Sequence, residues 1–246
     1  MSTLPKILDP CPVVEASIEI RYSTELPGDA VFGVLYAEIS KQFPTSLTKL
    51  PILQVPEAVR MSDPNLIYQP HYLLSVPSQG NVSVSIGPKV ILFSNVQPYI
   101  GWNKFFKFVS DALTLIANTT IFDSVERVGL RYIDIFKDTA LLGRIHTELI
   151  ITGDLILTEP TTIRIERTDG TYTLILQIAS NADIKSPTIN GKGSIIDIDC
   201  IYLFPPGSND FFSVYADIIE ISHQKEKSTF FSLLKDDFLQ EFNPSY

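Results

Sequence analysis

The sequence predicts an α+β protein with antiparallel sheets in two packed halves, each covered by amphipathic helices, and with a helical C-terminus. Three observations support this fold class. Short runs that alternate apolar and polar residues are separated by turn residues, which is typical of antiparallel strands. Two segments, residues 29–43 and 102–116, repeat apolar residues at steps of three and four. Residues 211–238 show the same helical period.

The first expected half, residues 1–137, has the order β-α-β-β-β-α-β. Its expected strands are Val13–Tyr22, Tyr72–Val76, Asn81–Ile86, Lys89–Val96 and Glu126–Phe136, and one further short strand, outside this order, is expected near Pro51–Arg60. Its first helix is expected to begin at an N-cap, Asp29, and to end before Pro44. Prolines recur through residues 44–70, so this part is expected to be an irregular connection.

The second expected half, residues 138–246, consists of β-hairpins followed by helices. Its expected strands are Glu148–Leu157, the two arms of Thr162–Ile178, and Ser194–Phe204. Asp169–Gly170 between two alternating runs indicates a tight hairpin turn, and a further turn is expected at Asn190–Gly193. The helical tail is expected to break within Ser222–Ser228.

The stretch Pro98–Asp134 contains the residues that we consider most informative. Its helix carries Trp102 at the head of an apolar and aromatic stripe, which predicts burial against a sheet. In the strand that follows, Val128, Leu130 and Tyr132 share one face, and Arg127 and Arg131 share the other. Two interpretations of the arginines stay open.

In the first interpretation, Arg131 pairs with an acid on a neighbouring strand, such as Glu15 or Glu19. In the second, Arg127 and Arg131 line a cleft and hold an anion, because arginine is suited to bidentate recognition of carboxylate or phosphate. The second interpretation gives a candidate ligand-binding set at the strand end and the aromatic turn. Its members are Arg131, Tyr132, Asp134 and Trp102.

The charge balance restricts the class of partner. The formal net charge is −9, and lysine and arginine form no run that would build a basic patch. Such a chain lacks the electrostatic footprint of general nucleic-acid binding and is poorly suited to anionic membranes. We therefore expect a protein partner or a homo-oligomer, with no nucleic acid and no membrane.

A cytoplasmic location is expected from the N-terminal segment and the cysteines. The start, MSTLPKILDPCP, lacks the basic and apolar regions of a secretory signal. No stretch approaches the ~20 apolar residues of a membrane helix. Cys11 and Cys200 lie far apart with no CxxC pairing, which favours two free thiols, although a single disulfide between them is an open alternative.

No catalytic, metal-binding or cofactor-binding motif is recognised. The three histidines, His71, His146 and His223, show no zinc-binding spacing, and His223 is interpreted as closing a helix. Asp197 and Asp199 share one strand face and could be a carboxylate pair, but an exposed strand face explains them equally well. Gly191–Ser194 is interpreted as a hairpin turn rather than a phosphate loop. We therefore expect no catalytic residue, no metal and no cofactor.

Four segments, taken together and in order, resemble a known family. They are PVVEASIEIRY, PYIGWNKF, RVGLRYID and HQKEKSTFFSLLKDDFLQEF. The family is a sporadically distributed prokaryotic family of uncharacterised proteins of about this length, with a VVEA strand, a Gly-Trp-x-x-Phe segment, a Leu-Arg-Tyr-Ile strand, and a C-terminal His before a Phe-rich helix. Asp134 stands where that family commonly has Asn. The resemblance implies no activity or cofactor; the family's patchy distribution is associated with mobile or defence-related systems.

Two functions follow as hypotheses. The favoured one is a non-enzymatic protein-interaction or assembly module, because the chain is acidic, aromatic-rich and poor in catalytic motifs. The alternative is a small-molecule-binding or enzymatic domain with an anion-holding cleft near Arg131.

Overall fold

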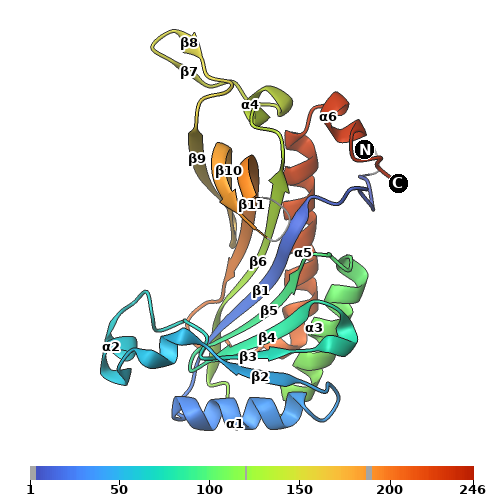
Figure 1. Ribbon diagram of the computed structural model, residues 1–246. Helices are drawn as coiled ribbons and strands as arrows, with labels where there is room; N and C mark the ends of the chain where they lie inside the picture. Colours follow the sequence, from blue (N-terminus) through green and yellow to red (C-terminus); the bar gives the residue numbers. More distant parts are fainter. Residues whose placement is uncertain (1–3, 120, 187–189) are drawn as a thin grey trace. The chain divides into compact units, whose positions relative to one another are not determined.

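The computed structural model describes residues 4–119, 121–186 and 190–246 (Figure 1). It confirms the α+β class, with long strands, amphipathic helices and a helical C-terminus. The strands are β1 (Val13–Ser23), β2 (Ser46–Lys49), β3 (Tyr72–Ser75), β4 (Val82–Gly87), β5 (Val90–Val96), β6 (Ser124–Phe136), β7 (Ile150–Ile151), β8 (Asp154–Leu155), β9 (Thr161–Asp169), β10 (Tyr172–Lys185) and β11 (Asn190–Leu203).

The helices are α1 (Gly28–Ile39), α2 (Glu57–Ser62), α3 (Trp102–Ile116), α4 (Leu141–Arg144), α5 (Phe211–Leu233) and α6 (Asp236–Gln240). Two short 3₁₀ turns cover Pro51–Gln54 and Pro77–Gln79. In the part of the chain that the structure describes, no helix is both long and apolar enough to cross a membrane.

Nine of the strands form one sheet in the order β2-β3-β4-β5-β1-β6-β11-β10-β9, and β7 and β8 form a separate pair. The pairs β2–β3, β3–β4, β4–β5 and β9–β10 are antiparallel. The predicted hairpin strands at residues 72–96 and the Asp169–Gly170 hairpin are thereby confirmed. Gly170 has a φ of +60°, which a glycine adopts easily in such a turn.

The chain folds into two compact units, and neither is one continuous stretch of sequence. Unit 1 comprises Met1–Glu15, Arg131–Cys200 and Ile221–Tyr246, and unit 2 comprises Ala16–Leu130 and Ile201–Glu220. These units differ from the halves 1–137 and 138–246 expected from the sequence, because β1, β6, β11 and α5 each contribute residues to both units.

The core of unit 2 is apolar and aromatic. The predicted stripe of α3 is buried through Phe105, Val109, Leu113 and Ile116, and Phe108 is buried as well. The ring centroid of Phe108 lies 5.0 Å from that of Phe43 and 6.2 Å from that of Phe93, both in edge-to-face contacts. The helix therefore covers β-strands with a wide hydrophobic face, as its sequence period predicts.

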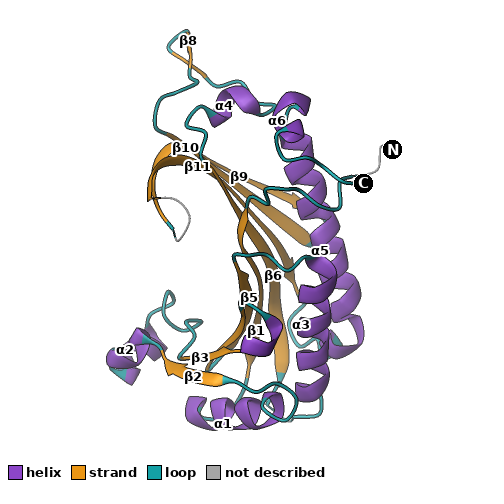
Figure 2. Cartoon of the chain, turned by 45° about the vertical axis from the view of Figure 1, so that its right-hand side comes forward, coloured by secondary structure: helices purple, strands orange, loops and turns teal. Residues whose placement is uncertain are grey.

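The core of unit 1 lies between its strands and the C-terminal half of α5 (Figure 2). Leu176 and Ile178 of β10 and Ile196 and Ile198 of β11 belong to the same buried cluster as Phe230 of α5. The alternating pattern of β11 thus places its apolar residues toward the helix, as the two-residue period predicts.

Five predicted features are wrong in detail. The strand expected at Pro51–Arg60 is a 3₁₀ turn followed by α2, and the strand of this region is β2 instead. Prolines at 51 and 56 begin these helical turns, where their fixed φ is favourable. Asp29 lies in the first turn of α1, and the N-cap position is Pro27.

The remaining three corrections concern unit 1 and the tail. Glu148–Leu157 is not one strand but the hairpin β7–β8, whose turn contains Thr152 (φ 56°) and Gly153 (φ 93°). Asn190–Gly193, expected as a turn, belongs to β11. The helix break expected within Ser222–Ser228 is absent, because α5 runs without interruption to Leu233.

Candidate functional site

The first candidate group surrounds Arg131 on β6. Its Nε donates to Oδ1 of Asp197 at 2.7 Å, and its Nη2 donates to Oδ2 at 2.6 Å, which makes a bidentate pair. Gln177 of β10 donates to the same carboxylate at 3.3 Å. The hydrogen bond from Asp197 raises the pKa of Arg131 above its usual value. Arg131 therefore joins β6 to β11, next to it in the sheet, through its guanidinium group.

Neither acid expected to be the hydrogen-bond partner of Arg131 fills that role. Glu19 pairs with Arg127 in unit 2, and Glu15 acts on Arg131 only through its charge. The interpretation that Arg131 has a carboxylate partner is right, but the partner is Asp197 of β11 rather than an acid of β1, although both strands neighbour β6 in the sheet. Asp197 is 8% exposed, so the explanation of Asp197 as part of an exposed face is wrong.

Gly129 makes room for the other arginine. A Cβ at this position would lie 2.9 Å from both terminal nitrogens of Arg127. The guanidinium group of Arg127 thus folds back over the glycine and pairs with Glu19. This explains the Arg-x-Gly-x-Arg spacing of the strand as a packing requirement for Arg127.

The second candidate group is a set of buried carboxyl groups in unit 1. Asp134 of β6 is 2% exposed and Glu226 of α5 is 4% exposed. Burial, together with the charge of Asp197, raises the pKa of Asp134 to about 8. Burial, together with the charge of Asp134, raises the pKa of Glu226 well above its usual value. At neutral pH both groups thus favour the protonated form, in which a carboxyl can donate a hydrogen bond.

Tyr132 and His223 lie beside each other in unit 1, with ring centroids 5.9 Å apart. Tyr132 is 4% exposed and belongs to the inward face of β6, as its parity predicts. His223 does not close a helix, since it lies in the middle of α5. The sequence predicts a helix that breaks near His223, so its place beside the buried Tyr132 does not follow from the sequence.

The four sequence-predicted site residues do not form one cluster. Arg131 lies on the opposite face of β6 from Tyr132 and Asp134, because successive residues of a strand alternate. Trp102 belongs to unit 2, where its Nε1 donates to Oε2 of Glu220 at 2.9 Å and its ring stacks on Phe106 at 5.0 Å. The sequence draws attention to Asp134, but it contains no sign that Glu226, which lies in a charged run of the tail, is a second buried carboxyl residue.

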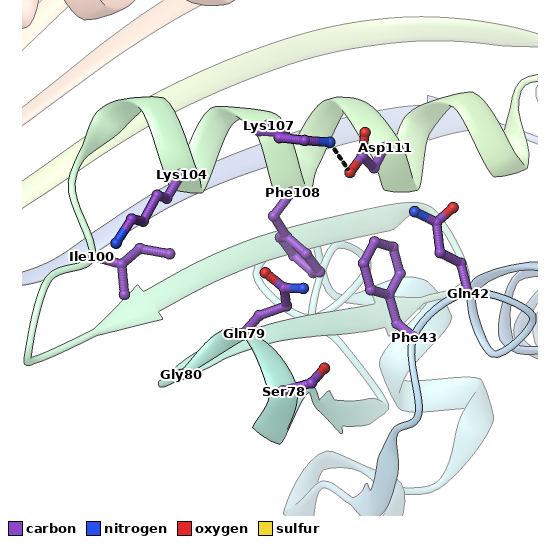
Figure 3. A pocket seen from close by; sticks show the side chains of 10 residues that line it. All are labelled: Gln42, Phe43, Ser78, Gln79, Gly80, Ile100, Lys104, Lys107, Phe108 and Asp111. Atoms are coloured by element: carbon purple, nitrogen blue, oxygen red, sulfur yellow. Dashed lines mark hydrogen bonds and ion pairs between the residues drawn. The ribbon is translucent and has the colours of Figure 1, made fainter.

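A pocket of about 550 Å³ lies in unit 2 beside α3 (Figure 3). Phe43, Phe108 and Ile100 supply its apolar wall. Its polar lining comes from Gln42, Ser78, Gln79, Lys104, Lys107 and Asp111. Nζ of Lys107 pairs with Asp111 at 2.6 Å, whereas the side chain of Lys104 points toward Ile100 (Figure 3). The size suits a small molecule.

The described residues contain no group of three or more His, Cys, Asp and Glu side chains placed to hold a metal ion. Cys11 and Cys200 are free thiols. Burial raises the pKa of Cys200 to about 11, so its thiol stays protonated and is a poor nucleophile.

The hairpin β7–β8 is the most exposed apolar feature of unit 1. Its exposed fractions are 62% for Ile150, 52% for Ile151, 50% for Leu155 and 38% for the following Leu157. The hairpin extends beyond α4 and β9 (Figure 1). One strand is expected over this stretch from the sequence, although the Thr152–Gly153–Asp154 turn between two apolar pairs is a hairpin signal. Four large apolar side chains this close together are typical of an interaction surface.

No protein-family model matches the chain, and no curated protein is significantly similar to it.

Proposed function

We propose that this chain is a non-enzymatic protein-interaction or assembly module that binds its partner with the β7–β8 hairpin. The observation that supports the proposal is the exposure of Ile150, Ile151, Leu155 and Leu157 within eight residues of sequence. Burying such side chains in a complex stabilises it by roughly 25 cal/mol per Å² of apolar surface removed from water.

The same proposal includes a cytoplasmic location, a prokaryotic source and a protein partner rather than nucleic acid or lipid. The net charge of −9 supports the choice of partner, because a polyanion would be repelled. The resemblance to the sporadically distributed family, and with it a link to mobile or defence-related systems, remains part of this proposal.

The test compares two surface variants of the purified chain. The hairpin variant carries Ile150→Ser, Ile151→Ser and Leu155→Ser, and the control carries Val59→Ser and Met61→Ser on α2, which are also exposed. Each is used for capture from an extract of the native host and for mass measurement by light scattering. We expect wild type and control to retain a partner or a mass above 27.5 kDa, and the hairpin variant to lose it.

Equal behaviour of the hairpin variant and the α2 control contradicts the role of the hairpin. A strictly monomeric wild type that captures no partner contradicts the interaction function itself.

Binding of a small anion is the second candidate function. Its expected location was Arg131, whose side chain is 45% exposed, but Asp197 already occupies the guanidinium fork. The pocket beside α3 is the better location, because Lys104 and Lys107 bring positive charge to a lined cavity. A thermal-shift screen with anionic metabolites tests it: Lys104→Ala should abolish the shift, and Arg131→Ala should leave it.

A further inference from the structure

The two edges of the sheet differ in how strongly they discourage pairing with another strand. The edge strand β2 has four residues, ends in Lys49 and is followed closely by Pro51. Short length, lysine and proline are the usual means of blocking an edge. The other edge, β9, has nine residues and contains no lysine, glycine or proline. Among the described residues, β10 is its only neighbour in the sheet (Figure 1).

The side chains of β9 form two different faces. Ile163 and Ile165 lie opposite Ile178 and Leu176 of β10, which belong to the core of unit 1. Ile165 nevertheless remains 36% exposed, since no strand covers its outer side. On the other face, Nη2 of Arg164 pairs with Oε2 of Glu166 at 3.1 Å, and both side chains are 51% exposed. The free edge thus offers Ile163 and Ile165, followed by Arg167 and Asp169, on one face and the Arg164–Glu166 pair on the other.

Symmetry restricts how two copies of β9 can pair. Directly opposed residues in an antiparallel pair point to the same face, so a two-fold axis normal to the sheet must pass through a residue position. If the two-fold axis passes through Glu166, the two copies of this carboxylate lie opposite each other. If it passes through Arg164, two guanidinium groups lie opposite each other. Both arrangements are destabilising.

Centring on Ile165, the middle residue of β9, avoids both conflicts. Each Arg164 then lies opposite Glu166 of the other copy, which creates two complementary charge pairs. Ile165 lies opposite its own counterpart and makes an apolar contact at the centre of the junction. All nine residues of the strand find an opposed residue, with Ile163 facing Arg167 and Thr161 facing Asp169.

We propose that a second copy of this chain pairs antiparallel with β9 in this register and makes a two-fold dimer with a continuous sheet. The inference rests on the proposed function, since it names the assembly partner as the chain itself. It assigns the contact to main-chain hydrogen bonds along the β9 edge, with Arg164 and Glu166 setting the register.

A charge-exchange series measured by light scattering across a dilution range tests the dimer. Wild type should approach twice 27.5 kDa at high concentration. Arg164→Glu and Glu166→Arg should each weaken the dimer by about tenfold or more, since each creates two like-charge contacts. An equimolar mixture of the two single variants should restore dimers, because the two carboxylates of one copy then face the two guanidinium groups of the other. The double variant should also dimerise.

A cysteine crosslink tests the register in the same full-length chain, with Cys11→Ser to remove the exposed native thiol. Ile165→Cys should form an intermolecular disulfide under mild oxidation, because its counterpart Cβ lies about 4.5–5.5 Å away. Thr162→Cys is the matched control and should not crosslink, since it faces Thr168.

The outcomes separate this inference from the proposed function. A monomeric wild type overturns the dimer, and the capture experiment with the hairpin variant then tests the proposed function independently. A dimer unaffected by the charge exchanges, or crosslinked equally at residues 162 and 165, overturns the β9 register. A dimer that obeys the charge series but ignores the hairpin variant supports the inference and overturns the assignment of binding to the hairpin.

Discussion

The two compact units differ in where they place charge. All three buried carboxyl residues of the described chain, Asp134, Asp197 and Glu226, belong to unit 1. The buried polar residues of unit 2 are uncharged serines and Asn95, together with His71. Burying a carboxyl costs free energy unless it is paired or protonated. The free-energy cost of buried carboxyl groups thus falls on unit 1, and we expect the two units to respond differently to substitution and to pH.

The largest effect should come from breaking the apolar core of unit 2. Phe108→Ala removes a ring that is 2% exposed and contacts both Phe43 and Phe93. The free energy of unfolding should fall by about 3–5 kcal/mol, measured by urea denaturation. Phe108→Leu is the matched control and should cost about 1 kcal/mol, because it keeps most of the volume. A loss below that of the leucine control would show that unit 2 does not depend on this core.

Breaking the ion pair of unit 1 should have a smaller effect. Arg131→Ala leaves Asp197, which is 8% exposed, without its bidentate donor. We expect a loss of about 2 kcal/mol in unfolding free energy, since Arg131 is partly exposed and the pair is only half shielded from water. Lys107→Ala, which breaks an exposed helix pair with Asp111, should cost about 0.3–0.5 kcal/mol. Equal losses in the two variants would contradict the importance of burial.

Neutralising a buried carboxyl of unit 1 should stabilise the protein. The pKa of Asp134 is about 8 in the folded chain and 3.8 in its ordinary setting, so the folded state holds a proton that the unfolded state releases. Its contribution is therefore most favourable below pH 4 and becomes unfavourable as the pH rises toward 8. Asp134→Asn should raise the unfolding free energy at pH 7 by about 2 kcal/mol, after allowance for relaxation of the buried site.

The pH dependence provides the check on this prediction. Denaturation curves recorded between pH 5 and 8 should show a smaller decline for Asp134→Asn than for wild type. Glu226→Gln should reduce the decline as well, because burial and the charge of Asp134 raise the pKa of Glu226. Unchanged slopes in both variants would contradict raised pKa values for these two carboxyl groups.

Unit 2 should respond to pH in the opposite direction. His71 is 8% exposed, and Nη1 of Arg60 lies 3.0 Å from its Nε2. Burial, and then the charge of Arg60, lowers the pKa of His71 to about 4. The stability that depends on neutral His71 is present above pH 6.5 and is lost as the pH falls toward 4. At pH 5 the loss should be about 1 kcal/mol, and His71→Gln should remove this dependence.

The sequence predicted best what depends on local periodicity. The α3 stripe, the inward face of β6 and the Asp169–Gly170 hairpin follow from spacing and turn chemistry alone. The α5 helix was predicted with a break because Ser222–Ser228 reads as polar and cap-like, yet Ser222 and Glu226 are buried. Tertiary packing overrode the local signal there.

The contacts of the candidate site depend on strand order, which the sequence did not contain. Arg131 was expected to find an acid, but β6 lies between β1, which carries Glu15 and Glu19, and β11, so the strand neighbours alone do not select Asp197. Glu226 was missed because its distance in sequence from Asp134 gives no hint that the charge of Asp134 raises its pKa. Local pattern thus predicts faces, whereas long-range pairing decides which charges meet.

The smallest effect on stability is expected at the hairpin of unit 1. This prediction gives the clearest contrast with the buried core of unit 2. Ile150→Ser with Ile151→Ser changes side chains that are 62% and 52% exposed, so the unfolding free energy should change by less than about 0.5 kcal/mol. In unit 2, by contrast, one buried ring is worth several times more. A stable hairpin variant that no longer captures a partner would show that these isoleucines are exposed for binding rather than for folding. A variant that unfolds would instead mean that the hairpin packs within unit 1, and the proposed interaction surface would be lost.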